Sequence, residues 1–467
     1  MDRMGVLDAG FLHAEDSDRH VSLAIGGLAV LDGPAPDYDR LLTTLGARMS
    51  ACPRFKQRVR LRPLDIGPPE WVDDDDFDLT RHVRRIGVPA PGGETELHAL
   101  VAEMMSWRLD RARPLWEIWV IEGLAEHRWA MLMKVHHCIA DGIATAHMLA
   151  GLSDDGVAAA YPAPDGDPPA VRPPARPAGD SPGWLAGLRD ASVAAAAATA
   201  RAVRGAGEIT AGLLRPAATS SLNGPMSGRR RYAAVRVPLA DIRRVCRTFD
   251  VTVNDVALAA LAESYRDTLI RHGEIPQHDS LRTLVPVSVR GDGEADRTDN
   301  RVSVMLPYLP VEEANPVQRL RMVRARMART KSAGQQQAGS AAVGIANAVV
   351  PYPLTAWAVR LATRLPQRGV VALATNVPGP PRPLSILGCR VLAVLPVPPI
   401  AMRLRTGVAI LSYADDLYFG VLADFDALPD IDDLVGGIRV AVARLVAASK
   451  RRKTARDRRG LQLVVNA

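Results

Sequence analysis

The chain of 467 residues has few aromatic residues and few cysteines, and both shortages limit what the protein can be. Phe, Trp and Tyr together make up only 4% of the residues, so small and aliphatic side chains must supply most of a core. The four cysteines, Cys52, Cys138, Cys246 and Cys389, lie far apart and form no Cys-x-x-Cys pair. This pattern argues against a disulfide framework or a zinc site and favours free thiols in a reducing compartment.

The sequence also lacks the usual marks of exported and membrane-spanning proteins. Residues 1–5 do not begin the basic and then apolar pattern of a signal peptide. The apolar stretch Ala341–Leu365 is interrupted by prolines and arginines, so it is too broken to span a bilayer. It is either a helix pair packed between domains or an interfacial segment with Trp357 at the level of the headgroups. We expect a cytoplasmic protein, with peripheral association to a membrane or lipid droplet left open.

The charge is moderately basic. The formal net charge of +7 favours acidic partners such as phosphates, coenzyme A or anionic lipid. A basic chain also suggests a nucleic-acid binder, but here the charge is spread out and no recognition module is visible. Nucleic acid is therefore not an expected partner.

Strand and helix signals alternate along both halves, which predicts an α/β (α+β) fold class. The first half shows a strand at Val21–Leu31, a helix at Glu96–Leu109 and a strand pair at Leu115–Ile121 and Arg128–Val135. The second half shows helices at Val251–Ile270 and Asp430–Ala448, strands at Leu281–Val289 and Val302–Leu309, and a hairpin at Val408–Val421.

The composition divides the chain into four parts. We expect a first domain over residues 1–152 and a linker with an Ala-rich helix over 153–227, where eight prolines fall between Tyr161 and Pro182. A second domain follows over 228–449, and a solvated basic tail over 450–467. No internal repeat is visible.

The segment 135–142 (VHHCIADG) indicates a strand that runs into a tight turn and then a helix. Side chains alternate across a strand, so His137 falls on the apolar face and His136 beside Lys134. A histidine on an apolar face suits a general base, because burial penalises the charged imidazolium. Adjacent residues point to opposite faces, so the two histidines cannot easily bind one metal, and we expect none.

Each residue of this segment also has a purely structural interpretation. A single buried histidine is usually a core residue, and Asp141 is a common helix N-cap in any protein. Gly142 permits a close backbone approach. From these residues alone, catalysis and structure are about equally supported.

Several further motifs occur in the same order as in a known family. They are Leu7-Asp8-Ala9-Gly10-Phe11, Pro114-Leu115-Trp116, the HHxxxDG segment from His136 to Gly142, Val253-Asn254-Asp255-Val256 and Asn376-Val377-Pro378-Gly379-Pro380. Together they resemble the bacterial bifunctional wax ester synthase/diacylglycerol acyltransferase family, within the coenzyme A-dependent acyltransferases that include chloramphenicol acetyltransferase. The resemblance runs from residue 7 to about residue 448.

This resemblance implies a two-domain chloramphenicol-acetyltransferase-like fold, with mixed sheets flanked by helices and a channel between the halves. It implies transfer of an acyl group from long-chain acyl-CoA, a co-substrate, to diacylglycerol or a fatty alcohol, with no cofactor. A related acyltransferase with another hydroxyl acceptor and a non-catalytic lipid-binding homologue remain alternatives.

The resemblance also assigns roles to residues. His137 would be the general base, with His136, Asp141 and Gly142 around it and Asp141 paired with an arginine such as Arg290. Asn254 would aim a donor at the site, and Asp255 either binds substrate or caps its helix. Substrate contacts are further expected from Pro114, Leu115, Trp116, Asn376, Pro378 and Gly379. Residues 263–266 (ESYR) depart from the family's Gly-Ala-Leu-Arg-like turn, which predicts a packing change or a different channel shape.

Overall fold

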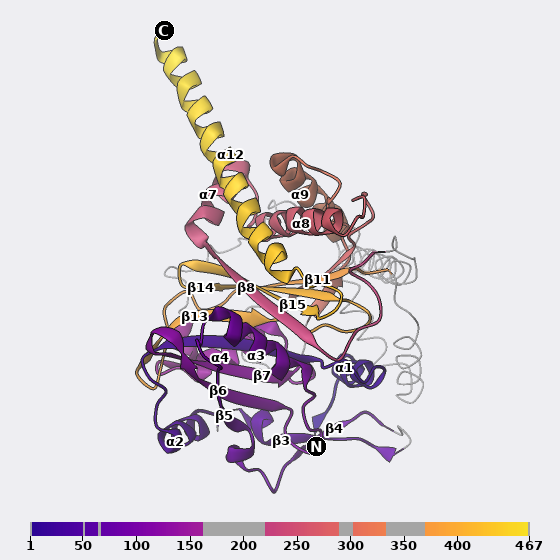
Figure 1. Cartoon of the computed structure of the whole chain (residues 1–467), viewed down its shortest axis with the longest axis vertical. Coiled ribbons are helices and arrows are strands. Elements are labelled where there is room, and N and C mark those ends of the chain that lie inside the picture. The colour runs from indigo at the N-terminus through magenta and orange to yellow at the C-terminus, as the bar shows by residue number, and fades with distance from the viewer. Residues whose placement is uncertain are drawn as a thin grey trace, which may run out of the picture.

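The computed structural model describes residues 2–49, 52–63, 67–161, 220–288, 302–332 and 369–465. These residues form two six-stranded sheets, a small three-stranded sheet and the helices around them (Figure 1). The expected α/β architecture is confirmed. The linker sequence 162–219, Arg290 and all of Ala341–Leu365 lie outside the described residues.

The first half contributes these elements: β1 (Asp2–Arg3), α1 (Val6–Asp16), β2 (Ala24–Asp32), α2 (Tyr38–Met49), η1 (Pro53–Lys56), β3 (Gln57–Arg60), β4 (Glu70–Asp73), η3 (Leu79–Arg81), β5 (Val83–Gly87), α3 (Glu94–Ser106), β6 (Trp116–Leu124), η4 (Ala125–His127), β7 (Arg128–His136), α4 (Gly142–Gly151) and α5 (Gly156–Ala160). The second half contributes β8 (Arg230–Pro238), α7 (Leu239–Phe249), α8 (Val253–Arg271), β9 (Thr283–Ser288), β10 (Val302–Met305), α9 (Pro316–Ser332), β11 (Ala372–Val377), β12 (Ser385–Ile386), β13 (Cys389–Val397), β14 (Thr406–Tyr413), β15 (Asp416–Asp424) and α12 (Ile431–Val465).

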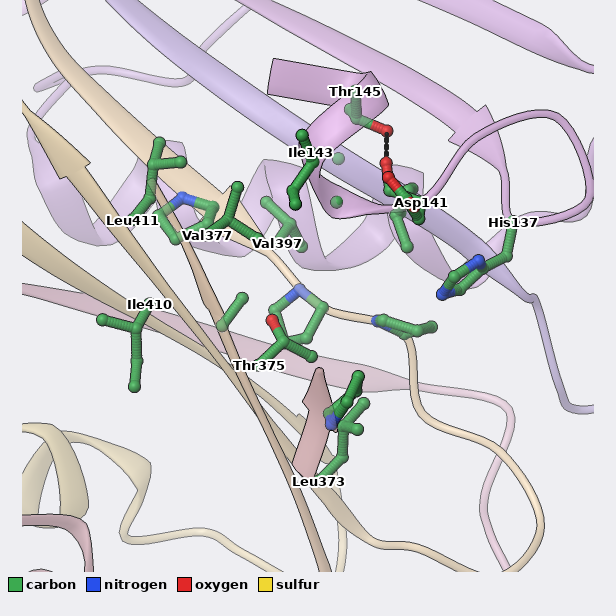
Figure 2. Close-up of a pocket in the computed structure, with 18 of the residues that line it drawn as sticks. His137, Asp141, Ile143, Thr145, Leu373, Thr375, Val377, Val397, Ile410 and Leu411 are labelled. Carbon is green, nitrogen blue, oxygen red and sulfur yellow. Dashed lines mark hydrogen bonds between the residues drawn. The ribbon is translucent and has the colours of Figure 1, made fainter. Parts of the chain in front are cut away.

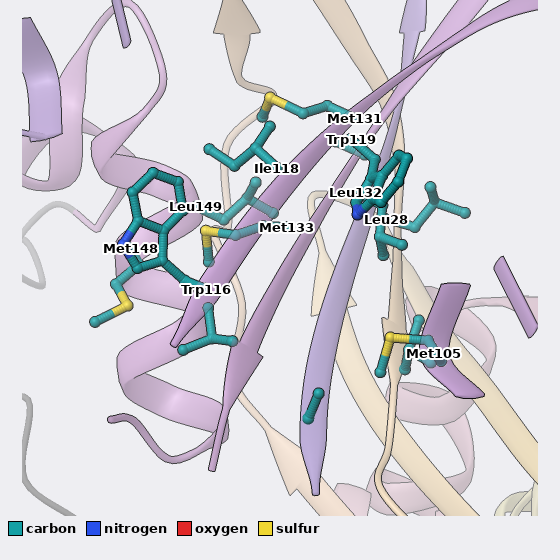
Figure 3. Packing of buried hydrophobic residues seen from close by; sticks show 14 of the residues in the cluster. Leu28, Met105, Trp116, Ile118, Trp119, Met131, Leu132, Met133, Met148 and Leu149 are labelled. Atoms are coloured by element: carbon teal, nitrogen blue, oxygen red, sulfur yellow. The ribbon is translucent and has the colours of Figure 1, made fainter. Parts of the chain in front are cut away.

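The first large sheet has the strand order β12-β13-β2-β7-β6-β5. Its central strand β7 is buried on both faces, which agrees with a sequence of nearly continuous apolar residues. The buried side chains of Met105, Met131 and Met133 belong to the same core cluster as Trp116 and Trp119 (Figure 3). Flexible methionine thus fills a core that has few aromatic rings.

The second large sheet has the order β10-β9-β11-β14-β15-β8, with the predicted hairpin at β14 and β15. Helices α7, α8, α9 and α12 lie on its outer side, and the first sheet lies on its other side (Figure 1). α8 is buried along most of its length, and small and apolar residues occupy every position from Val256 to Ala262.

The second half of the sequence contributes two strands to the first large sheet. Strands β12 and β13 belong to the second half of the sequence, yet β13 pairs antiparallel with β2 of the first sheet. Pro396 of β13 also reaches the second sheet, where its carbonyl oxygen accepts a hydrogen bond of 3.0 Å from the Tyr232 hydroxyl. The same oxygen would lie 1.7 Å from a Cβ added at Gly420, so β13 and β15 approach too closely for a side chain there. The halves predicted from composition are therefore joined through β13.

Helix α12 differs from its prediction. It was expected over Asp430–Ala448 and runs instead from Ile431 to Val465, through the stretch expected to be a basic tail (Figure 1). Lys450, Arg451 and Arg452 on this extension are exposed. Of the helices in the described ranges, none combines the length and the apolar character that crossing a membrane requires.

Candidate active site

The turn after β7 places the two adjacent histidines. The backbone amide of His136 donates to the carbonyl of Leu115 at 2.9 Å, and that of His137 donates to the carbonyl of Leu23, also at 2.9 Å. The Ile139 amide then donates back to the His136 carbonyl at 2.9 Å, which closes the turn. Carbonyls that directly precede β6 and β2 thus hold the backbone at His136 and His137.

The His137 ring faces a cavity between the two large sheets (Figure 2). It is half-buried and stacks on Phe11 of α1, with ring centroids 4.2 Å apart and planes inclined by 14°. The expectation that His137 lies on the apolar side is confirmed. Its stacking partner comes from the opening motif of the sequence, for which no role at the site was predicted.

His136 faces away from His137 into the protein. It is 1% exposed, and its Nδ1 accepts a hydrogen bond of 3.1 Å from the Cys138 amide. The other ring nitrogen, Nε2, lies 3.5 Å from Oε1 of Glu15. His136 is a buried polar residue that braces the turn.

His136 shares its face of β7 with Lys134, as expected, and Lys134 is completely buried as well. Its Nζ donates to the carbonyls of Met104 and Trp107 at 2.8 and 2.6 Å, at the end of α3. Burial lowers the pKa of Lys134 to about 8. The alternation of side chains was predicted correctly, but both faces of β7 are covered, and a lysine can be buried where helix-end carbonyls accept its protons.

Glu15 of α1 connects His136 to the rest of the first half. It is 1% exposed and accepts hydrogen bonds from the Leu23 amide at 3.0 Å and from Arg111 at 2.8 Å. Burial raises the pKa of this carboxyl, but the interactions with His136, Arg111 and Leu23 outweigh it, and the pKa falls to about 2. Sequence reasoning missed Glu15 and Arg111, because no local pattern places α1 under the turn.

Asp141 caps helix α4. Its Oδ1 accepts a hydrogen bond of 2.9 Å from the Ala144 amide, and its carbonyl accepts from the Thr145 amide and hydroxyl at 2.9 and 2.8 Å (Figure 2). The capping interpretation is confirmed. The proposed partner Arg290 lies in a part of the chain that the structure leaves undescribed.

Gly142 is explained by the approach of the second half. A Cβ at this position would lie 2.7 Å from Cγ2 of Val377, which belongs to β11. Only glycine lets α4 and β11 meet this closely. The HHxxxDG segment and the Asn376–Pro380 motif are therefore in direct contact across the cavity.

The cavity has a volume of about 320 Å³ and an almost entirely apolar lining drawn from both halves. Its polar lining residues among those described are His137, Asp141, Thr145, Thr375 and Asn376. Such a chamber accepts an aliphatic chain and offers one imidazole for proton transfer.

The second half places two amides near this site. Asn376 lines the cavity, and its Nδ2 donates to Oδ1 of Asn254 at 3.3 Å. Asp255, next to Asn254, instead forms a capping box with Thr252 at the start of α8, with hydrogen bonds of 2.9 and 3.1 Å. Asp255 does not line the cavity, so the structure supports its capping role, and a role in substrate binding stays a prediction.

The Pro114-Leu115-Trp116 motif lies in the core. Leu115 and Trp116 are completely buried, and Trp116 Nε1 donates to the carbonyl of Phe55 at 2.9 Å. None of the three lines the large cavity. The structure supports the core interpretation of this motif, in which the Leu115 carbonyl holds the His136 amide, and its substrate contact stays a prediction.

Gly379 and Pro378 also lie outside the cavity lining. A Cβ at Gly379 would lie 2.1 Å from the Ser412 carbonyl oxygen, and its amide donates to Ser412 Oγ at 3.1 Å. The turn after β11 therefore packs tightly on β14. Its substrate contact stays a prediction.

The departure from the family pattern at residues 263–266 is a packing change. The buried Glu263 pairs with the buried Arg319 and with the exposed Arg444, and the Tyr265 hydroxyl donates to Thr406 Oγ1 at 2.9 Å. Arg266 donates to the Val311 carbonyl at 2.7 Å. These residues connect α8 to its neighbours and do not line the cavity.

The comparisons with known proteins agree with this geometry. Residues 4–257 match the model of the wax ester synthase/diacylglycerol acyltransferase catalytic domain, and residues 298–445 match that of the WS/DGAT C-terminal domain. The chain belongs to the wax ester synthase/diacylglycerol acyltransferase family. It is therefore an acyl-CoA-dependent acyltransferase of this type.

Curated relatives and solved structures extend the comparison. The chain is 58% identical to the probable diacylglycerol O-acyltransferase tgs1 of Mycobacterium tuberculosis, over 100% of both chains. A second putative diacylglycerol O-acyltransferase of that species is 43% identical over 96% of this chain and 92% of its own. The wax ester synthase/diacylglycerol acyltransferase of Marinobacter aquaeolei VT8 matches with a TM-score of 0.66 at 26% identity, covering 96% of this chain and 100% of that one.

The fold is shared more widely than the family. The first condensation domain of the CDA synthetase matches with a TM-score of 0.60 at 16% identity, over 95% of this chain and 96% of that one. The expected two-domain acyltransferase fold is thereby confirmed.

Proposed function

We propose that this acyltransferase moves the acyl group of a long-chain acyl-CoA to the free hydroxyl of diacylglycerol, with His137 as the general base. The observation that carries the proposal is the position of the His137 ring at the wall of an apolar cavity between the halves. Diacylglycerol is favoured over a fatty alcohol because the relative at 58% identity is named a diacylglycerol O-acyltransferase.

The proposed reaction is a direct transfer. His137 takes the proton from the acceptor hydroxyl, whose oxygen attacks the thioester carbonyl and forms a tetrahedral oxyanion. The intermediate then collapses to the ester, and the imidazolium returns its proton to the departing thiolate of coenzyme A. No cofactor enters this sequence.

A covalent acyl-enzyme is not needed. The thiol beside the base, Cys138, is 2% exposed and does not line the cavity. Burial, with the charge of Asp8, raises the pKa of Cys138 well above its ordinary value, so its nucleophilic thiolate is disfavoured. Cys138 is a packing residue in this account.

The oxyanion requires a hydrogen-bond donor. Asn376 is the amide that lines the cavity, and its contact with Asn254 fixes its orientation. We therefore assign Asn376 as a candidate donor and Asn254 as the residue that positions it. A well-placed donor of this kind is worth about 3–4 kcal/mol in the transition state.

The test is an assay of purified protein with palmitoyl-CoA and either diolein or hexadecanol, in which release of the coenzyme A thiol is followed. We expect the higher rate with diolein, and we expect His137→Ala to lower turnover by about two to four orders of magnitude. A melting curve like that of the wild type shows that His137→Ala remains folded. Full activity of a folded His137→Ala variant would remove the base from the mechanism.

We also propose that the enzyme works at a lipid surface, because its acceptor does not dissolve in water. The exposed basic residues Lys450, Arg451 and Arg452 on α12 support weak attraction to anionic lipid. Cosedimentation with phosphatidylglycerol vesicles at low salt tests this, and protein that stays in the supernatant would count against it.

A further inference from the structure

Arginines gather at one end of the second sheet. The register places the starts of β9, β11 and β14 side by side, with Ala372 beside Thr283 and Leu373 beside Gly407. The end of β15 and the start of β8 lie at the same end, because Thr406 pairs with Ala423 and Asp424 with Arg230. Six arginines from three separate segments lie at this end: Arg229, Arg230, Arg231, Arg282, Arg403 and Arg405.

This end of the sheet adjoins the mouth of the cavity. Ala401, Met402 and Leu404 line the cavity, and Met402 is also 38% exposed to solvent. A residue that both lines the cavity and reaches solvent lies at its opening. Arg403 directly follows Met402 and therefore lies at the rim of this opening.

Most of these arginines are held without a carboxylate. Arg405 donates to the carbonyls of Ser221 and Pro225 at 2.9 and 3.1 Å. Arg229 and Arg231 lie over the same ring, with 3.6 and 3.8 Å from each guanidinium carbon to the centroid of Phe425. The two positive charges against this one ring repel each other, and an anion bound between them would offset that repulsion.

The carboxylates near these arginines interact with Arg230. Asp424 lies 3.8 Å from Arg230, and the charge of Asp18 acts on Arg230 as well. Within the described part of the chain, Arg229, Arg231, Arg403 and Arg405 have no ion pair with a carboxylate. No carboxylate among the described residues therefore compensates the positive charge of these four arginines.

Arg403 carries the sharpest signal. Its Nε is buried, and no hydrogen-bond partner for it exists among the described residues. Met402 and Arg403 both have left-handed backbone angles, with φ of 52° and 67°, which side chains other than glycine rarely adopt. Strain and an unsatisfied buried donor are costly, and they persist in proteins mainly at functional sites.

We propose that Arg229, Arg231, Arg403 and Arg405, the rim arginines, bind the phosphate groups of acyl-CoA as its acyl chain enters the cavity past Met402. This inference rests on the proposed use of acyl-CoA. Guanidinium groups suit it, since they bind phosphate through paired, charge-assisted hydrogen bonds. The phosphate of an anionic lipid has the same chemistry, and the test separates the two sources.

The test compares Arg403→Gln with a matched control in the full-length protein. The control, Arg236→Gln, also removes one positive charge. Arg236 lies on β8, near the end opposite to Arg230 and Arg231. It is 66% exposed and pairs with Asp416 at 3.5 Å. Calorimetry measures binding of coenzyme A and of pantetheine, which lacks the nucleotide phosphates. Kinetics measure KM for palmitoyl-CoA and for S-palmitoyl-pantetheine.

We expect Arg403→Gln to weaken coenzyme A binding and raise the KM for palmitoyl-CoA by about three- to tenfold, with a smaller effect at high salt. Binding of pantetheine and the KM for its thioester should not change, and Arg236→Gln should match the wild type throughout. The double variant Arg229→Gln/Arg403→Gln should show a larger effect.

Equal affinity for coenzyme A in the wild type and in both rim variants would overturn the proposal. An equal loss for pantetheine would do the same, because it would indicate a disturbed cavity. A rim variant that loses binding to phosphatidylglycerol vesicles but keeps its affinity for coenzyme A would assign the arginines to lipid. Coenzyme A binding without any acyl transfer in the wild type would contradict the proposed function and leave the rim site standing.

Discussion

At the scale of single residues, the account separates the two histidines of the HHxxxDG segment. His137 faces the cavity, whereas His136 is buried against Glu15 and accepts a hydrogen bond from the Cys138 amide. Glu15 also bonds the amide of Leu23, whose carbonyl accepts from the His137 amide. Glu15 is therefore a positioning residue, which acts on the proposed base through His136 and the backbone of Leu23.

Substitution of Glu15 by Gln should lower stability at neutral pH. The pKa of Glu15 is about 2 in the folded protein, whereas that of an unperturbed glutamate, as in the unfolded chain, is 4.5. Its carboxylate therefore stabilises the fold above pH 4.5, and this contribution is lost as the pH falls toward 2. The shift corresponds to about 3 kcal/mol. Urea denaturation should show this deficit at pH 7 and a smaller one at pH 3. Equal deficits at both pH values would contradict the assignment.

Replacement of Lys134 by Met should destabilise the first half although the side chains have similar lengths. The change leaves the carbonyls of Met104 and Trp107 buried without their donor. An unsatisfied buried acceptor costs about 1–3 kcal/mol. The melting temperature of the variant measures the loss, and an unchanged value would show that water replaces the ammonium.

At the scale of elements, the sequence predicted what depends on local pattern. The hairpin of β6 and β7, helix α8 and the strand-to-helix turn at His137 follow from periodicity and capping residues. Contacts between distant segments were not predictable in this way. The stacking of Phe11 on His137, the burial of Lys134 and the entry of β13 into the first sheet depend on which elements meet.

The contact between α4 and β11 gives a prediction at this scale. In Gly142→Ala the new Cβ would lie 2.7 Å from Val377 Cγ2, so one element must shift, at a cost of about 1–3 kcal/mol. Because Val377→Ala removes that methyl group, the double variant should recover much of the stability. A double-mutant cycle by thermal unfolding measures the coupling, and strictly additive losses would contradict the contact.

At the scale of the whole molecule, the active site belongs to neither half alone. The first half supplies His137 and Phe11, the second supplies Asn376 and most of the apolar lining, and β13 ties the two sheets together. Of the motif residues, His137, Asp141, Gly142 and Asn376 line the cavity. Leu115, Trp116 and Gly379 serve the packing that forms the cavity, whereas the rim arginines come from segments that no single motif connects.

The most direct test of the central claim is the single-turnover rate of transfer of a labelled palmitoyl group from palmitoyl-CoA to diolein. The account predicts that folded His137→Ala forms ester about 10²- to 10⁴-fold more slowly than the wild type. Ester formation at the wild-type rate by that variant would show that the imidazole in the cavity is not the base.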